Sequence, residues 1–492
     1  MARQLRLYDD ADLSTRQNLV LTPGPVEKLG KAGLKMLPSD LGLASCFAGS
    51  VVPMPQGGFR LYYSAVGSWS PAMFRIALAE SADGLNWDKP PLGQVEHQGL
   101  QTNWIWPEGM PHGASITQPQ VCPLPDGTWR MWYWWHGHDI ARVRYVACES
   151  QDGINWRVID LDMPHIMHPS DRELGQNAWV AGLTAASPRD RFADERTLEW
   201  TEAKRLRSND ATYVYYNEDT ARFDMYSVWL MPNDPSTGRH TPHDNAPAVL
   251  RAIQRRESPD GIVWSDPDLV ITPDAHDPMH QQFYHLAVHR QDEWSIGLLG
   301  SYRCWEQTMD IELCFSRDTR HWLRPLRGGW IPRGGIDETD YMSAYPTNRL
   351  IDEGATWLLL YEAGNMKHNH ELPVGVAERS RQTMAARIPK GRFAGLQAPD
   401  RAVGSLTTRP FILGAEHISL NANVRGRLQA ELRDPYGRPL PGYELNSCLP
   451  VAGDSHRHTL RWHGNRTTAD YLYDPVSLRV EIEDGTVYSI EV

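Results

Sequence analysis

The sequence predicts an all-β fold, a five-bladed β-propeller followed by a C-terminal β-sandwich. Three observations predict it: a hairpin motif that recurs, strand-like runs before each copy, and a composition that suits short strands. The 492 residues include 39 Gly and 36 Pro, which favour tight turns, and 19 Trp and 19 Tyr against only 9 Phe. This length exceeds what one hydrophobic core usually supports, so more than one domain is expected.

The repeated hairpin has the form Ser-x-Asp-Gly-x-x-Trp. Complete copies occupy residues 81–87, 150–156 and 258–264, and a fourth copy at 316–322 has Thr319 in place of the glycine. Asp-Gly supplies a turn whose glycine adopts a positive φ, and the Trp returns on the next strand to pack the unit. The motif therefore predicts the outer hairpin of a repeated β-unit.

A run of strand character lies upstream of each copy, and a fifth run lies where the motif has decayed. Each unit then reads as an inner strand, a turn, two alternating strands and an outer hairpin, which is a four-stranded blade. The runs cover residues 59–63, 129–134, 223–229, 294–299 and 356–361. Five such units predict five blades.

Two features set the predicted domain boundaries. Residues 157–208 are a long interval between copies, which predicts a functional insertion, a lid or subsite wall with a short helix near 197–205; a solvated decoration is the alternative. Later in the chain, short alternating strands broken by Asp-Gly and Pro-Gly turns predict the sandwich. The propeller is thus expected over 1–393 and the sandwich over 394–492.

Charge and hydropathy exclude several classes of protein. A formal net charge of −12 lacks the broad positive field of non-specific nucleic-acid binders. No apolar run approaches the roughly 20 residues of a membrane helix, and the N-terminus has no apolar signal region, so a cytoplasmic protein without a membrane partner is expected. The six cysteines include no Cys-x-x-Cys pair and are predicted to be buried. No cofactor is expected, and a homo-oligomer is left open.

The repeated hairpins followed by a sandwich resemble the five-bladed propeller glycoside hydrolases of families 32, 43, 68, 117 and 130, from Asp40 to the end of the chain. In that group, carboxylates from different blades meet at a funnel formed by the starts of the innermost strands. Cleavage needs one carboxyl to protonate the leaving oxygen and another to attack or to activate water. The Asn-Asp-Pro-Asn, Arg-Asp-Pro and Glu-Cys signatures of family 32 are missing, so the resemblance assigns no acid and base roles.

The predicted catalytic residues are acids that stand just before inner strands. Asp210 directly precedes a Tyr-rich run and is the first candidate, and Asp40 precedes the first inner strand. Glu338 and Asp340 precede the fifth inner strand, and as alternate residues they are predicted to point to the same side of a strand. Turn capping or a solvated loop position is the alternative for each.

The second and fourth blades have no acid at the strand start and offer histidines there instead. A histidine could act as a general acid, orient a carboxylate or bind a sugar hydroxyl, and tryptophans could stack on the apolar face of a sugar. The predicted substrate-binding residues are His112, Gln118, His285, Trp104, Trp106 and Tyr345. Surface histidines and core tryptophans are the alternatives. His368 and His370 have ligand-like spacing, but two ligands make no site, so no metal is predicted.

These observations predict an exo-acting glycosidase similar to families 32 and 43. It would release a terminal sugar, such as a furanoside or an anhydro-sugar, from a small oligosaccharide by carboxylate acid/base catalysis. One alternative is a glycoside phosphorylase on the same fold, which needs one acid and a cluster of Arg, Lys or His for phosphate. Another is a non-catalytic sugar-binding propeller whose acids only accept hydrogen bonds.

Overall fold

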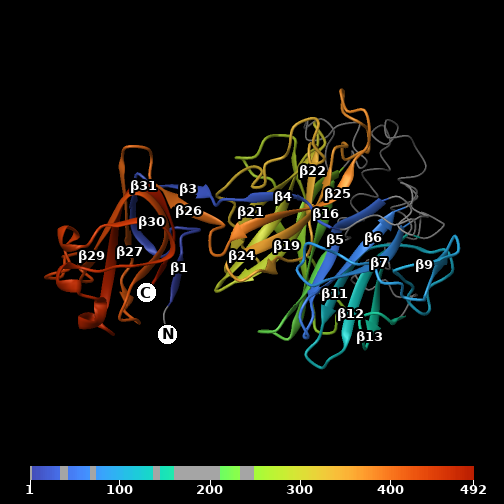
Figure 1. The fold of residues 1–492 in the computed structure, drawn as a ribbon, viewed down its shortest axis with the longest axis horizontal. Helices are drawn as coiled ribbons and strands as arrows, with labels where there is room; N and C mark the ends of the chain where they lie inside the picture. The colour runs from blue at the N-terminus through green and yellow to red at the C-terminus, as the bar shows by residue number, and fades with distance from the viewer. Residues whose placement is uncertain (1–2, 34–42, 67–73, 137–143, 160–210, 233–248) are drawn as a thin grey trace. The chain divides into compact units, whose positions relative to one another are not determined.

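The computed structural model describes residues 3–33, 43–66, 74–136, 144–159, 211–232 and 249–492 (Figure 1). The described chain is all-β, as predicted, and divides into two compact units. The ring unit comprises residues 27–323 and 327–387, and the nine-stranded unit comprises residues 1–26, 324–326 and 388–492. The first residues of the chain therefore belong with its last hundred rather than with the ring.

The ring unit begins with three antiparallel sheets of four strands each. Within each sheet, the strands follow the order of the sequence from the innermost strand outward. The first contains β5 (Leu43–Pro53), β6 (Phe59–Val66), β7 (Phe74–Ser81) and β10 (Trp104–Ile105), with the small hairpin β8 (Glu96–His97) and β9 (Leu100–Gln101) before β10. The second contains β11 (Ser115–Pro123), β12 (Trp129–His136), β13 (Arg144–Ser150) and β14 (Trp156–Val158). The third contains β15 (Tyr213–Asn217), β16 (Arg222–Pro232), β17 (Val249–Ser258) and β18 (Asp268–Ile271).

The remaining strands of the ring unit form one eight-stranded sheet. Counting the three sheets above as the first three groups of strands, the fourth group consists of β19 (Gln281–Gln291), β20 (Trp294–Arg303) and β21 (Thr308–Ser316). The fifth group consists of β22 (Ser343–Pro346), β23 (Ile351–Asp352), β24 (Thr356–Gly364), β25 (Arg381–Pro389) and β4 (Glu27–Lys31). The two groups are joined by a single bridge between Met309 and Ser343. Because they are continuous, the count of five blades stays a prediction.

The innermost strands follow one another around a closed ring. β5 contacts β11, β11 contacts β15, β15 contacts β19, and β22 contacts β5, while β19 is linked to β22 through β20 and β21 of the same sheet. Each group also lies in a separate stretch of sequence, apart from β4, which comes from the start of the chain and pairs with β25. Sheets arranged radially in this way are the architecture of a β-propeller, as predicted.

The repeated motif closes its turn with its own side chains. In the first copy, Ser81 Oγ accepts hydrogen bonds from the backbone N–H groups of Asp83 (3.2 Å) and Gly84 (2.8 Å). Asp83 Oδ1 accepts two more from the residues that follow, both at 2.8 Å. Gly84 has a φ of 77°, and Thr319, which replaces the glycine in the fourth copy, has a φ of 65°. The predicted positive-φ turn is confirmed, and the fourth copy keeps it without glycine.

The same turns also join neighbouring sheets. Tyr62 of the first sheet donates a hydrogen bond to the carbonyl of Gly153 in the turn of the second sheet, at 2.7 Å. In the same way, the turn of the first sheet lies against the fifth group of strands, where Gly84 packs on Ile351. Each turn thus contacts the sheet before it, which closes the ring through side chains as well as through β4.

A belt of buried polar side chains links the innermost strands. Ser50 donates to a backbone carbonyl of β11 at 3.1 Å, and Gln120 accepts from a backbone N–H of β15 at 3.3 Å. Tyr213 donates across the ring to the carbonyl at the end of β22 at 2.7 Å, and Asn348 accepts from a backbone N–H of β5 at 2.9 Å. The Tyr213 hydroxyl is thus used in a structural hydrogen bond between innermost strands.

The nine-stranded unit is one curled antiparallel sheet. Its strands are β1 (Gln4–Arg6), β2 (Leu13–Gln17), β3 (Val20–Pro23), β26 (Ala394–Gln397), β27 (Val403–Thr408), β28 (Phe411–Ile412), β29 (Ser419–Arg433), β30 (Val451–Thr459) and β31 (Pro475–Glu491). Three short 3-10 turns are η6 (Leu445–Ser447), η7 (His463–Asn465) and η8 (Thr468–Tyr471). The long strands β29 and β31 pair with register shifts, which bend a sheet. A sandwich of two separate sheets stays a prediction.

Candidate functional site

Side chains from four groups of the ring meet near the starts of the innermost strands. The ring of His285 on β19 lies 6.1 Å from Phe47 of β5, 6.1 Å from Tyr213 of β15 and 6.0 Å from Tyr345 of β22. Phe47 and Tyr345 are themselves 4.6 Å apart. We call these four residues the axial cluster. The structure therefore brings together two of the predicted substrate-binding residues, His285 and Tyr345.

Local backbone features place His285 at the axis. The register of β19 against β20 shifts between Phe283 and Leu286, and a bulge of this kind re-aims the side chains within it. Gly300 on β20 lies directly beneath the imidazole, and a Cβ at that position would overlap the His285 ring. The bulge and the glycine together make the space that the histidine fills.

Burial sets the protonation state of this histidine. His285 has no exposed surface, and desolvation lowers its pKa to about 3. The imidazole is therefore neutral at ordinary pH. A neutral imidazole can donate or accept a hydrogen bond, but it cannot act as the proton donor of a glycoside cleavage at pH 7.

Glu362 supplies a buried carboxylate beside the axial cluster. It lies opposite Tyr345 in the pairing of β22 with β24 and is 1% exposed. Arg381 Nη1 is 2.9 Å from Glu362 Oε1, and the backbone N–H of Phe47 donates to Oε2 at 3.4 Å. The positive partner stabilises the charge of a carboxylate that is removed from water.

The sequence analysis did not single out Glu362. Its signal is a single acid within the otherwise apolar end of the run Trp357 to Gly364. Charged residues are seldom fully buried without a partner, so an acid at such a position marks a paired or functional group. The distant partner, Arg381, is visible only in the structure.

Basic side chains gather on the same side of the ring. Arg251 of β17 has no exposed surface, and its guanidinium lies 5.6 Å from the ring of Tyr284 and 5.2 Å from that of Tyr302. His368 contacts the same two rings at 4.7 and 4.8 Å, and its Nδ1 is 3.3 Å from Tyr345 Oη. Burial, with a smaller effect from two nearby arginines, lowers the pKa of His370 to about 4. Arg251 is thus a buried cation near the axial cluster, whereas His370 is neutral at ordinary pH.

Two predicted catalytic acids, Asp40 and Asp210, lie outside the described residues, as do the 157–208 insertion beyond residue 159 and the short helix predicted within it. The residue after Asp210 is described, and it is held firmly. The backbone N–H of Ala211 donates to Gln118 Oε1 at 2.8 Å, and both residues have positive φ, 60° and 57°. Gln118, predicted to bind substrate, thus anchors the entry to β15 from β11.

The other two predicted acids do not share a strand. Residues 336–342 form turns rather than the start of an inner strand, so the alternation expected for Glu338 and Asp340 does not apply. Asp340 is 1% exposed, pairs with Lys28 at 2.6 Å and accepts from the N–H of Gly334 at 3.1 Å. Glu338 is exposed, and its carboxylate accepts a hydrogen bond from the backbone N–H of Gly335 at 2.7 Å. Their described contacts are those of acids that hold a glycine turn and β4.

The predicted sugar platforms of the first sheet lie apart from the axial cluster. Trp104 is 2% exposed, belongs to the hydrophobic core and sits on β10, the outermost strand of its sheet. Trp106 and the exposed His112 stack on each other with ring centroids 6.5 Å apart, and the guanidinium of Arg75 lies 5.7 Å from Trp106. These residues form a separate group at the rim.

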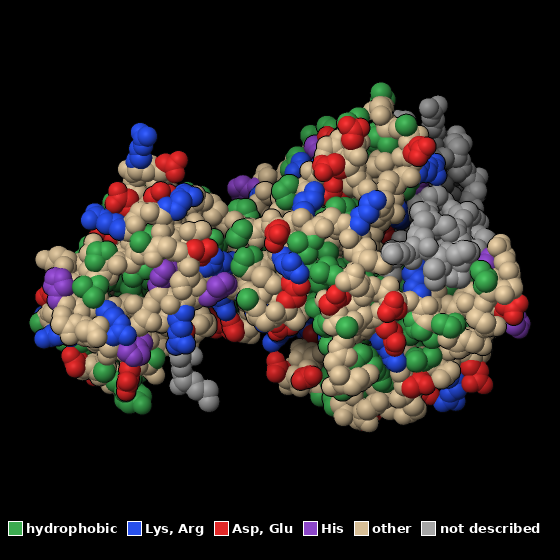
Figure 2. All heavy atoms as spheres, in the orientation of Figure 1, with side chains coloured by type: hydrophobic (Ala, Val, Ile, Leu, Met, Phe, Trp, Pro, Cys, Tyr) green, Lys and Arg blue, Asp and Glu red, His purple; other side chains and the backbone are tan. Residues whose placement is uncertain are grey.

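Several features bear on the other predictions. The five cysteines whose side chains are described, Cys122, Cys148, Cys304, Cys314 and Cys448, are all buried, and none of them forms a disulfide with another. Within the described ranges, no group of three or more His, Cys, Asp or Glu could hold a metal ion, and no helix is long and apolar enough to cross a membrane. Figure 2 shows acidic and basic side chains interspersed over the visible face, without a continuous basic patch.

No protein-family model matches the sequence, and no curated protein sequence matches it either. Solved structures are similar to it in backbone. A structure titled "Glycoside hydrolase" is 12% identical with a TM-score of 0.46, over 77% of this chain and 93% of that one. A thermostable family-43 glycoside hydrolase is 12% identical with a TM-score of 0.42, over 73% and 95%.

Two further structures widen the range of activities among the similar chains. An N-acetylgalactosamine deacetylase from F. plautii, in complex with blood group B trisaccharide, is 14% identical with a TM-score of 0.45, over 76% of this chain and 97% of that one. A structure from a GH130 family of mannoside phosphorylases that contains glycoside hydrolases is 10% identical with a TM-score of 0.44, over 74% and 94%. Similarity at this level establishes no shared activity.

Proposed function

We propose that the chain is a glycosidase that removes a terminal sugar from a small oligosaccharide. The axial cluster carries this proposal. Aromatic faces such as Phe47 and Tyr345 suit the apolar face of a sugar ring, and Glu362, Arg381 and the neutral His285 offer hydrogen-bond acceptors and donors to its hydroxyls.

Asp210 is the proposed catalytic carboxylate, with Asp40 as its partner. Both stand before inner strands in the sequence, and the backbone N–H of Ala211, which follows Asp210, donates a hydrogen bond to Gln118. One carboxyl would protonate the leaving oxygen, and the other would attack the anomeric carbon or activate water. Because burial keeps His285 neutral, the proton comes from a carboxyl rather than from that imidazole.

A screen of aryl glycosides against the full chain, followed by substitution, tests this proposal. Asp210→Asn is expected to lower kcat by at least about 100-fold, the usual contribution of a general acid or base, with an unchanged melting temperature. Asp268→Asn is the matched control, since Asp268 is half-exposed on the outermost strand of the third sheet and pairs with Arg320. Full turnover by Asp210→Asn would refute the assignment.

Phosphorolysis is a second candidate, favoured by the cationic side of the axial cluster. Arg251, Arg381 and His368 approach the site from three strands or loops, and groups of this kind bind a phosphate oxyanion. Turnover that requires inorganic phosphate and releases a sugar phosphate would establish it. Turnover that is indifferent to phosphate would establish hydrolysis, and tight sugar binding without any turnover would favour the binding module.

A further inference from the structure

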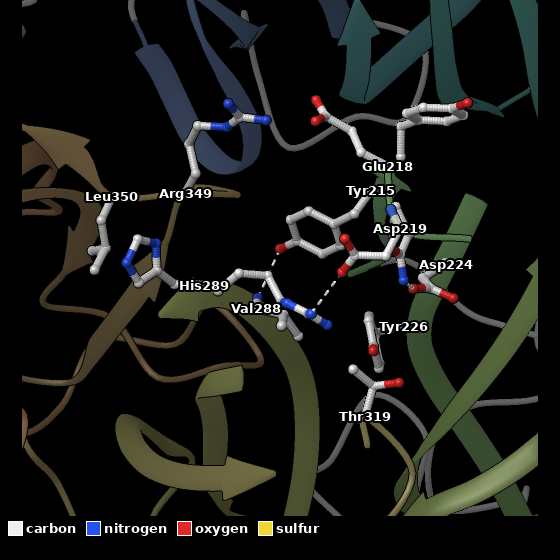
Figure 3. A pocket seen from close by; sticks show the side chains of 13 residues that line it. Tyr215, Glu218, Asp219, Asp224, Tyr226, Val288, His289, Thr319, Arg349 and Leu350 are labelled. Carbon is white, nitrogen blue, oxygen red and sulfur yellow. Dashed lines mark hydrogen bonds and ion pairs between the residues drawn. The ribbon is translucent and has the colours of Figure 1, made fainter. Parts of the chain in front are cut away.

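A hollow lies at the end of the innermost strands that is opposite to the axial cluster (Figure 3). It has a volume of about 430 Å³ and is formed where β15 and β19 end and β22 has just ended. An adjoining hollow of about 450 Å³ lies at the ends of β5 and β11. The two share Tyr216, Glu218 and Arg349, so they open onto one set of side chains. All lining residues belong to the ring unit.

A layer of hydrogen-bonded side chains separates this hollow from the axial cluster. Tyr215 Oη donates to the carbonyl of Asn348 and accepts from the N–H of Val288, both at 2.8 Å, which ties together three innermost strands. Along β19, His289 of the hollow is four residues beyond His285, or about 13 Å. A ligand in the hollow would therefore not touch the proposed catalytic site.

Arg349 is the notable cation of this hollow. Its Nε is buried without a hydrogen-bond partner, and its guanidinium forms no ion pair with any of the described residues. The other two arginines at hand are matched: Arg290 lies 3.1 Å from Asp219, and Arg255 lies 2.7 Å from Asp224. A half-buried, unmatched guanidinium is costly unless something pairs with it.

Glu218 is the corresponding free anion. It is exposed, lines both hollows and forms no ion pair within the described part of the chain. In Figure 3 the charged ends of Arg349 and Glu218 point toward one another across the opening. The walls between them carry the aromatic rings of Tyr215 and Tyr216. The opening thus presents the guanidinium of Arg349 as a hydrogen-bond donor, the carboxylate of Glu218 as an acceptor, and the apolar faces of two tyrosine rings.

We propose that this hollow binds a small hydroxylated anion, a sugar acid or a sugar phosphate. Its carboxylate or phosphate would pair with Arg349, whose planar fork matches either group, and its hydroxyls would donate to Glu218. Tyrosine rings suit the apolar face of the same ring. The site is independent of the proposed glycosidase activity, because no residue of the axial cluster takes part.

Isothermal titration of the full chain with glucuronate and with glucose 6-phosphate tests the site. Arg349→Gln is expected to weaken both at least about tenfold, the usual value of one charge-assisted hydrogen bond, and Arg349→Lys to weaken them less. Glu218→Gln, at an exposed position where folding is not at risk, is expected to weaken them about threefold to tenfold. Neutral glucose should bind at least tenfold more weakly than either anion. Arg222→Gln, which removes a half-exposed arginine outside the hollow, should change nothing.

Several outcomes would overturn the proposal. If Arg349 only supports the fold, neither anion will bind, and absence of binding refutes the site. Binding unchanged by both Arg349→Gln and Glu218→Gln refutes it as well. Binding lost in His285→Asn but kept in Arg349→Gln would move the ligand to the axial cluster. If inorganic phosphate bound as tightly as glucose 6-phosphate, the sugar hydroxyls would contribute nothing to binding, which would contradict their proposed hydrogen bonds to Glu218.

Discussion

The innermost strands of the ring unit and the main core of the nine-stranded unit are stabilised in different ways. The innermost strands of the ring unit bury polar residues such as Ser50, Gln120 and Asn348, which hydrogen-bond from one sheet to the next. The core of the nine-stranded unit is built from apolar side chains such as Leu428 and Val480, both fully buried. Apolar packing holds a curled sheet together, but a ring of sheets also needs directional contacts that define each neighbour.

This difference also separates structure from chemistry. Buried ionisable groups at the ring axis, among them Glu362 and His285, cost free energy that a purely structural core would avoid. Such groups are concentrated at sites where binding or catalysis needs them. We therefore expect changes in the nine-stranded unit to alter stability alone, and changes at the ring axis to alter activity or its dependence on pH.

The largest expected effect is in the nine-stranded core. Leu428→Ala removes a fully buried side chain and is expected to lower the free energy of unfolding by about 2–5 kcal/mol, from lost burial and the cavity left behind. Turnover per folded molecule should stay unchanged. Chemical denaturation and kcat measured on the same sample check this. A fall in kcat under conditions where both variants are folded would break the proposed separation.

A smaller effect concerns pH and the ring axis. His285 has a pKa of about 3 in the fold and about 6.5 when unfolded, so between these values the unfolded chain binds a proton that the folded chain does not. Stability is therefore complete above pH 6.5 and falls by up to about 1.4 kcal/mol per pH unit below it.

His285→Asn should make this fall shallower between pH 6.5 and pH 4.5, because the substituted side chain does not titrate. Unfolding titrations at several pH values measure the slope. His417→Asn, at an exposed position of the nine-stranded unit, serves as the control and should keep the full slope. Equal slopes for the two variants would show that His285 is accessible to protons in the folded state.

The smallest expected effect separates the fourth motif turn from the other three. Thr319 has a φ of 65°, a backbone conformation that strains a β-branched residue by about 1–2 kcal/mol. Replacement by glycine relieves this strain, but the greater flexibility of glycine in the unfolded chain offsets part of the gain. Thr319→Gly is expected to raise the free energy of unfolding by up to about 1 kcal/mol. Gly261→Ala should act in the opposite direction, because a Cβ there would lie 2.5 Å from Trp132. Stabilisation by both changes would contradict the turn geometry.

Local pattern predicted much of this fold. The positive-φ turns, the strand runs and the buried motif tryptophans such as Trp87 and Trp264 follow from short stretches of sequence, because turn chemistry and alternation act over a few residues. The role of β4 in completing the last sheet was not predicted, because pairing with β25 joins segments some 350 residues apart. The same holds for the membership of residues 1–26 in the nine-stranded unit.

The candidate site divides in the same way. His285 was found from its position at a strand start, and the structure places it beside Tyr345, another predicted substrate-binding residue. Glu338 and Asp340 met the same criterion, yet their backbone forms turns. The Asp340 carboxylate holds Gly334 and Lys28, and the Glu338 carboxylate holds Gly335. Position in a repeat indicates which end of a strand a residue occupies, but not which way its side chain points.

By itself, the sequence determined the all-β class and the repeating hairpins. Each depends on interactions between residues close in the chain. Only the tertiary structure decided that Glu362 pairs with Arg381, that Trp104 belongs to a core, and that Arg349 stands unmatched beside a hollow. Those outcomes depend on which distant strands become neighbours, and burial and charge pairing are properties of that assembled neighbourhood rather than of any local pattern.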